Sequence, residues 1–203
     1  MIETVENVIQ LAVTGLSAVI AGCRALSGKR AWLLVCLYSG AFFLGDLYWL
    51  LYLVFYGETP YYCFIPEISW IASFLFLFLL LLELRGNRLS RPRPVLWLVP
   101  MFTVGMCAFF MLKGEYFSNA LYAVLLTLIL WQAVGGLMDR GEKRRTRGVY
   151  WCALYFCFME YALWLSSWHW LGDTLLNPYF LIDLLLTLTF PMVTVAVKRA
   201  VGK

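Results

Sequence analysis

The sequence is poor in histidine and in charged residues, and both shortages narrow the classes of protein to which it can belong. His169 is the only histidine, which excludes hydrolases whose zinc ion needs several histidine ligands. Charged residues make up 14% of the chain, where a soluble domain has about a quarter, and 63% of the residues are hydrophobic. We therefore expect lipid, rather than water, to surround most of the folded chain.

Several functional signatures are also missing. The sequence has no phosphate-binding loop, no nucleophile elbow and no redox-cofactor motif, and no two of its six cysteines have the spacing of zinc ligands. No lysine stands inside the last apolar stretch, which excludes a retinal Schiff base. Asn177-Pro178 lies at the start of that stretch and indicates a helix start rather than a receptor motif. We expect no cofactor and no metal ion, and we assign no catalytic residue.

Seven stretches are long and apolar enough to cross a bilayer, which takes roughly 20 residues. They cover residues 5–26, 31–56, 66–84, 94–112, 116–138, 148–169 and 177–197. Little chain is left over, so we predict an all-α integral membrane protein with one seven-helix domain over residues 1–203. Glu3 and Glu6, without an early lysine or arginine, argue against a cleaved signal peptide.

The basic residues predict the orientation of these helices. Fifteen of the sixteen lysines and arginines lie at the end of the first, third, fifth or seventh stretch or in the segment after it, and only Lys113 does not. The positive-inside rule then places the N-terminus outside and the C-terminus in the cytoplasm. We expect the protein to lie in the cell membrane. Because the charges are spread over every inner loop, we expect contacts with lipid headgroups and not with nucleic acid. The basic loop 139–147 is a candidate site for a cytoplasmic protein partner.

Four carboxyl residues stand inside or at the outer ends of the apolar stretches. Asp46 interrupts the run FFLGDLYWLLYLVFY, and Glu67, Glu160 and Asp183 lie at mid-depth or in the outer half of theirs. A charged carboxylate at the centre of a spanning helix costs about 2.5–3.5 kcal/mol. No lysine or arginine occurs at that depth. Either the carboxyls are protonated and hold helices together by hydrogen bonds, or a cation comes from elsewhere.

Aromatic residues accompany two of these acids at helical spacing. Tyr38, Gly45, Trp49, Tyr52 and Tyr56 form one stripe, with Asp46 on its edge, and Tyr150, Cys157, Tyr161, Trp164 and Trp168 form another, with Glu160 on its edge. Such stripes pack helices together, but carboxylates beside aromatic faces also suit a small cationic or polar ligand. The candidate ligand-binding residues are therefore Asp46, Trp49, Tyr52, Glu67, Glu160, Tyr161, Trp164 and Asp183.

The distribution of polar residues suggests a tandem arrangement. The stretch 94–112 is nearly devoid of polar side chains, whereas the three stretches on either side of it carry them. This predicts two repeat units, 5–84 and 116–197, joined by the linker helix 94–112. The architecture resembles that of the small sugar and vitamin transporters and the retrieval receptors with three-plus-one-plus-three helices, although the Pro-Gln dipeptide of some of them is absent.

Three functions remain open on these grounds. The tandem pattern and the lack of an output domain in these residues favour a small-solute transporter. A membrane receptor that binds a similar ligand would need the cytoplasmic partner. A carboxylate-dependent intramembrane hydrolase would need two acids, such as Asp46 and Glu160, within reach of one substrate.

Overall fold

The computed structural model describes residues 2–60, 64–112, 114, 116–139, 141 and 144–202, and these residues form helices and short loops with no strand. The helices are α1 (Ile2–Ala25), α2 (Arg30–Tyr56), α3 (Phe64–Leu84), the 3-10 helix η1 (Pro94–Trp97), α4 (Leu98–Met111), α5 (Tyr116–Met138), α6 (Arg147–Ser167), α7 (Pro178–Thr187) and α8 (Thr189–Val201). Seven spans are long and apolar enough to cross a membrane, with η1 joined to α4 and α7 to α8. The predicted seven-helix fold is confirmed.

The last span is broken in the middle. Leu188 lies between α7 and α8, and Pro191 follows within the first turn of α8. The proline ring cannot donate to the carbonyl of Thr187, four residues earlier, and clashes with it. The break therefore falls at the residue after that carbonyl, as a proline at this position predicts.

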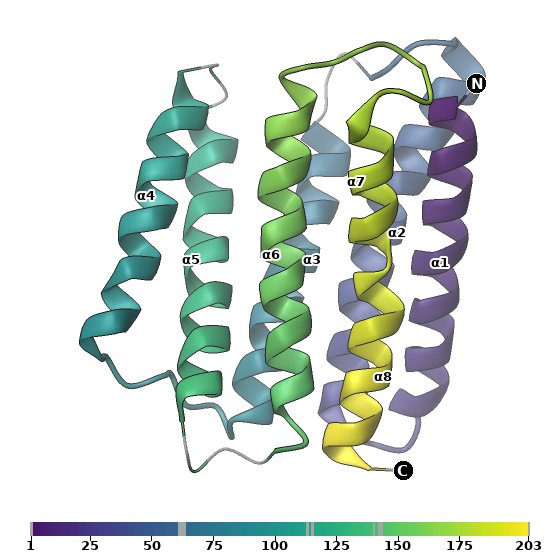
Figure 1. Cartoon of the computed structure of the whole chain (residues 1–203). Coiled ribbons are helices and arrows are strands. Elements are labelled where there is room, and N and C mark those ends of the chain that lie inside the picture. Colours follow the sequence, from purple (N-terminus) through teal and green to yellow (C-terminus); the bar gives the residue numbers. More distant parts are fainter. Residues whose placement is uncertain are drawn as a thin grey trace.

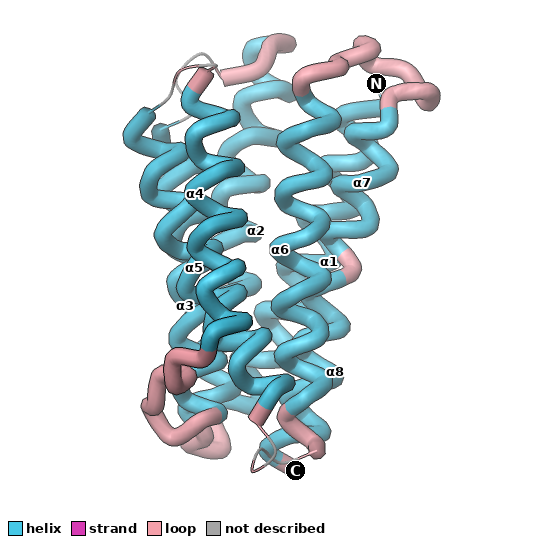
Figure 2. The backbone as a smooth tube through the Cα atoms, turned by 60° about the vertical axis from the view of Figure 1, so that its left-hand side comes forward, coloured by secondary structure: helices cyan, strands magenta, loops and turns pink. Residues whose placement is uncertain are grey.

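Six of the spans form a ring, and the seventh lies outside it (Figures 1 and 2). Around the ring, α1 packs on α2, α2 on α3, α3 on α5, α5 on α6, α6 on α7 and α8, and these two on α1. The α4 helix packs on α5 at the edge of the molecule. This order agrees with two three-helix units joined by a spacer, although the equivalence of the two halves stays a prediction.

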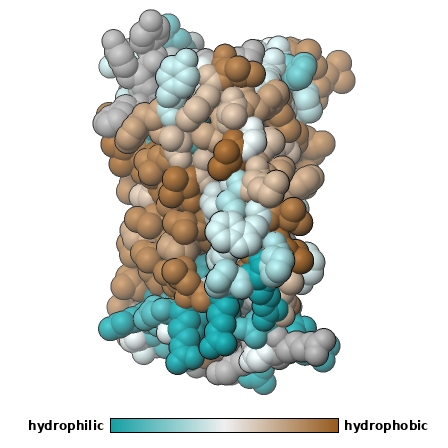
Figure 3. Space-filling model, turned by 90° about the vertical axis from the view of Figure 1, so that its left-hand side faces the viewer, coloured by the Kyte–Doolittle hydropathy of each residue, from teal (hydrophilic) through white to brown (hydrophobic). Residues whose placement is uncertain are grey.

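The outer surface suits a lipid environment. Large hydrophobic side chains are exposed on every span, including Leu16, Leu44, Val104 and Phe158. The face seen in Figure 3 is hydrophobic over most of its height and ends in a hydrophilic band at the end where the C-terminus lies. We call this end the basic end and the opposite one the cavity end. Four basic residues of the orientation argument, Lys113, Arg140, Lys143 and Lys203, lie outside the described residues.

Polar side chains fix the loops at the basic end. The guanidinium of Arg85 forms an ion pair with Asp139 (Nη2–Oδ2 3.0 Å) and donates to Ser90 Oγ at 2.6 Å. The amide of Ser90 in turn donates to Gln132 Oε1 at 2.8 Å. A Cβ on Gly135 would lie 2.3 Å from Ser90 Oγ, so only glycine lets the loop approach α5 this closely. These contacts attach the segment between α3 and η1 to α5.

Fully buried aromatic rings fill the middle of the ring of helices. Tyr38 of α2 stacks on Phe190 of α8 (centroids 4.8 Å apart) and meets the edge of Phe156 of α6. Phe74 of α3 packs edge-on against Phe156 at 4.9 Å. Offset and edge-on aromatic pairs are favourable beyond their buried area. This layer joins both halves of the ring and forms the floor beneath the cavity described next.

Candidate ligand-binding cavity

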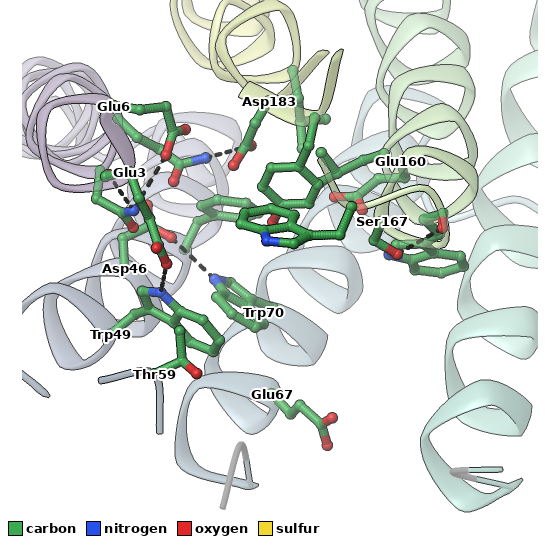
Figure 4. A pocket seen from close by; sticks show the side chains of 18 of the residues that line it. Glu3, Glu6, Asp46, Trp49, Thr59, Glu67, Trp70, Glu160, Ser167 and Asp183 are labelled. Atoms are coloured by element: carbon green, nitrogen blue, oxygen red, sulfur yellow. Dashed lines mark hydrogen bonds between the residues drawn. The ribbon is translucent and has the colours of Figure 1, made fainter. Parts of the chain in front are cut away.

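A cavity of about 690 Å³ lies between the helices at the cavity end. This volume is within the range of small-molecule sites. The lining residues are Glu3, Glu6, Asn7, Gln10, Phe42, Asp46, Trp49, Thr59, Glu67, Trp70, Phe74, Tyr122, Glu160, Leu163, Trp164, Ser167, Trp170, Asp173, Tyr179, Asp183 and Leu186. They come from all six helices of the ring and from the loops after α2 and α6, as the close view in Figure 4 shows in part.

Carboxyl groups dominate the polar lining. Seven of the lining residues are acidic: Glu3, Glu6, Asp46, Glu67, Glu160, Asp173 and Asp183. Among the described lining residues there is no lysine, arginine or histidine. Four of the acids are at least 95% buried, namely Glu6, Asp46, Glu160 and Asp183. Because removing a charge from water is costly, this arrangement needs protons or a cation from outside the described chain.

One wall of the cavity consists of polar side chains from α1 and α7 that hydrogen-bond with one another. The Gln10 amide donates to Asp183 Oδ1 at 2.8 Å, and the Asn7 amide donates to Glu6 Oε2 at 3.2 Å. The carboxyl groups of Glu6 and Asp183 are neighbours, and Glu6 Oε1 is buried without a donor among the described residues. Two neighbouring carboxyl groups can bond to each other only when a proton, or a bound cation, stands between their oxygens. Figure 4 shows Glu6 and Asp183 on the same side of the cavity.

Asp46 is held by a tryptophan of the neighbouring helix. The indole N–H of Trp70 on α3 donates to Asp46 Oδ1 at 3.1 Å. The second carboxyl oxygen of Asp46, Oδ2, is buried and accepts no hydrogen bond from the described residues. A Cβ on Gly45 would lie 2.6 Å from Trp70 Nε1 and 3.2 Å from the Pro66 carbonyl, so the glycine makes room for the indole. The sequence Gly45-Asp46 thus positions one carboxyl oxygen and leaves the other toward the cavity.

The opposite wall is contributed by α6 and α3. Glu160 is 4% exposed, and among the described residues no side chain or backbone group donates to its carboxyl. Trp164, one turn further along α6, packs edge-on against Tyr122 of α5 at 5.2 Å. Glu67 at the start of α3 accepts a hydrogen bond from Ser118 of α5 at 2.9 Å. Figure 4 shows Glu160 across the cavity from Asp46, Glu6 and Asp183.

At the mouth of the cavity, the start of α1 is hydrogen-bonded to the loop after α6. The backbone amides of Ile2 and Glu3 donate to the Asp173 carboxylate at 3.3 and 2.8 Å. A carboxylate at this place satisfies amides that the first turn of a helix leaves unpaired. The Trp49 indole donates to Glu3 Oε1 at 3.4 Å, which links the start of α1 to α2.

Six of the eight residues predicted as ligand-binding line this one cavity, and two do not. Tyr52 packs against Tyr48 and Tyr56 along α2, and Tyr161 packs against Phe102 and Phe110 of α4. We predicted both as ligand-binding residues, and the lining of the cavity includes neither of them. Successive residues turn by about 100°, so Tyr52 points about 120° away from Asp46, and Tyr161 points about 100° away from Glu160.

Sequence reasoning missed several of the lining residues. The sequence interpretation uses Glu3 and Glu6 only as an argument against a signal peptide, and it does not include Trp70 or Asp173 among the ligand-binding residues. The sequence does indicate that Glu3 and Glu6 belong to the site, because they have helical spacing with Gln10 and continue the polar face of α1. Nothing in the sequence pairs Asp173 with the start of α1, since 170 residues separate it from Glu3.

No metal centre is evident in the described parts of the chain, where no group of three or more histidine, cysteine, aspartate or glutamate residues could hold a metal ion. Comparison with protein-family models, with curated proteins and with solved structures finds no match to the chain. Fold and surface define an integral membrane protein with seven helices and one acidic, aromatic cavity. Its function has to be inferred from that cavity.

Proposed function

We propose that this protein binds a small organic cation in the cavity and transports it across the cell membrane. One observation carries the proposal: seven carboxyl residues and four tryptophans line a single cavity whose described lining contains no basic side chain. An ammonium group pairs with carboxylates and is attracted to the faces of aromatic rings. A buried carboxyl that lacks a protein cation is the partner that such a ligand requires.

Two features of the fold favour transport. The cavity lies where the two three-helix groups meet, which is where transporters built from parallel repeats bind their substrates. The span that carries Asp183 is broken at Leu188, and discontinuous helices are common at transporter sites. In the proposed orientation the N-terminus is outside, so the cavity faces the exterior and the basic end faces the cytoplasm.

A receptor that signals to a cytoplasmic protein is the second candidate. At the basic end a recess of about 510 Å³ is lined by Gly28, Lys29, Arg30, Ala31, Glu83, Leu84, Thr146, Ala200 and Val201. Such a recess favours a partner there, next to the loop 139–147, of which residues 140, 142 and 143 lie outside the described parts. The hydrolase hypothesis gains no comparable support, because the carboxyl groups that are neighbours are Glu6 and Asp183, not Asp46 and Glu160.

Binding and uptake by the purified protein test the proposal. Butylamine, choline and diaminobutane should change the fluorescence of the cavity tryptophans, whereas butyrate should not, because an anion meets only carboxyl groups. Asp46→Asn should insert and fold as well as the parent, since an amide costs less in the membrane than a charge, but should weaken binding about tenfold or more. Trp49→Ala should weaken binding less, because it removes an aromatic face and no carboxyl group.

Glu58→Gln is the matched control, since Glu58 is an exposed acid at the same end that does not line the cavity. Uptake of the same cations into proteoliposomes separates transport from reception. Binding without uptake would favour the receptor. Failure of every cation to bind would refute the proposed function, and an Asp46→Asn variant with lower stability but intact binding would show that the aspartate is structural.

A further inference from the structure

We infer that the ligand is a linear diammonium ion, with two amino groups joined by an alkyl chain, rather than a monocation. This inference rests on the proposed cation-binding function and specifies its substrate class. Its starting point is not the number of acids but two places in the cavity where buried carboxyl oxygens have no donor among the described residues, one at Asp46 and Glu6 and one at Glu160.

The first place is Asp46 on α2. The side chain is 2% exposed, Oδ1 accepts one hydrogen bond from Trp70, and Oδ2 accepts none from the described residues. The neighbouring Glu6 and Asp183 present further carboxyl oxygens to the same region. A primary ammonium group has three N–H donors, and this region offers oxygens to all of them.

The second place is Glu160 on α6. It is 4% exposed and likewise accepts no hydrogen bond from the described residues. Figure 4 shows it on the other side of the cavity from Asp46, and no direct bond joins the two side chains. One ammonium group at Asp46 would therefore leave Glu160 without a partner, and an unpaired buried carboxylate is costly.

A single metal ion does not fit this arrangement. A divalent cation is held by several oxygens at about 2.0–2.6 Å from one centre, which needs ligands that converge. The described acids do not converge in that way, because no group of three or more could hold a metal ion. Two positive charges have to be separated in space, as they are at the two ends of a diamine.

The apolar part of the cavity lining suits a hydrocarbon chain. Phe42, Phe74, Leu163 and Leu186 contribute apolar surface, and Trp70 and Trp164 contribute aromatic faces. Methylene groups gain by leaving water for such a surface, whereas a compact, strongly hydrated ion does not. The cavity thus offers buried carboxyl groups on two helices and apolar surface in the same lining.

The test compares diaminobutane with butylamine, which has the same carbon chain and one amino group, by titration calorimetry on the purified full chain. Diaminobutane should bind about tenfold or more tightly than butylamine, because it satisfies both carboxyl sites. In Glu160→Gln the preference for the diamine should disappear. In Glu58→Gln, the control, it should persist. Magnesium chloride, whose cation carries the same charge of +2 as the diammonium ion, should not displace the diamine.

The outcomes separate this inference from the proposed function. If both amines bind equally to the parent protein, or if magnesium displaces the diamine, the ligand is not a diammonium ion, although cation binding stands. If Glu160→Gln weakens both amines by the same factor, Glu160 does not form a second site and the inference is wrong. If no amine binds, the proposed function fails as well. Binding of butylamine to Glu160→Gln shows that this variant is folded.

Discussion

At the scale of single residues, the cavity depends on one glycine as much as on its acids. Gly45 lets the Trp70 indole lie against α2, where its N–H donates to Asp46 at 3.1 Å. The bond fixes one oxygen of the carboxyl group and thereby the direction of the other. The position of Asp46 next to a glycine is visible in the sequence, but the reason for the glycine is a side chain 25 residues further on.

Gly45→Ala should displace Trp70 and break its hydrogen bond to Asp46. The added methyl group would overlap the indole, and overpacking of this kind costs about 1–3 kcal/mol of stability. We expect a lower melting temperature in detergent and weaker binding of diaminobutane than in the parent. Gly105→Ala on α4 is the control, since a Cβ there meets no atom within 4 Å. Equal effects of the two substitutions would contradict the role given to Gly45.

At the scale of helices, α4 differs from the other six spans. It packs on α5, exposes Met101 and Val104 over more than 60% of their surface, and contributes no residue to the cavity. Its contact with α6 consists of aromatic side chains, including the pair Phe110 and Trp164. A helix with one packed side and a wide apolar side faces lipid, as the nearly non-polar sequence of this stretch predicts.

Cysteine labelling can distinguish a lipid-facing helix from a cavity wall. In a background without the native cysteines, Trp49→Cys should react with a water-soluble maleimide, because Trp49 lines the cavity. Met101→Cys, near the middle of the span Pro94–Met111, should not react, since thiolates form only in water. Butylamine or diaminobutane should slow the reaction at position 49. Aqueous labelling along the middle of α4 would defeat the assignment of this helix to the lipid face and, with it, the tandem interpretation.

At the scale of the whole molecule, charge is divided between the two ends. The described basic residues lie at the basic end, and seven of the described acids line the cavity at the other. We expect the first group to orient the chain in a membrane by electrostatics, and we propose the second group as the ligand site. The segment between α3 and η1 contributes to the basic end with Arg85, Arg88, Arg91 and Arg93.

Replacement of these four arginines by glutamine should weaken the control of orientation, because their charges help to keep this segment in the cytoplasm. The orientation is measured on intact cells, from the reaction of a single cysteine, Leu89→Cys, with an impermeant maleimide. Arg85→Gln alone should leave orientation unchanged but lower thermal stability, since it removes the ion pair with Asp139. If the fourfold variant keeps its orientation, the remaining basic segments suffice and the weight given to this one is wrong.

The sequence by itself determined the number, the type and the approximate limits of the spans, because these depend on length and on local hydrophobicity. It also singled out Asp46, Glu67, Glu160 and Asp183, since a carboxyl in an apolar stretch is visible without any structure. The break before Pro191 is also a local effect, because proline removes a backbone donor and clashes with the preceding turn.

Only the tertiary structure decided which side chains meet. The order of the helices in the ring brings Glu6 to Asp183 and Trp70 to Asp46, and it turns Tyr52 and Tyr161 away from the cavity. Helical spacing gives the relative directions of side chains on one helix, but not the direction in which the helix faces its neighbours. That direction follows from packing between segments far apart in the chain, which a local pattern does not contain.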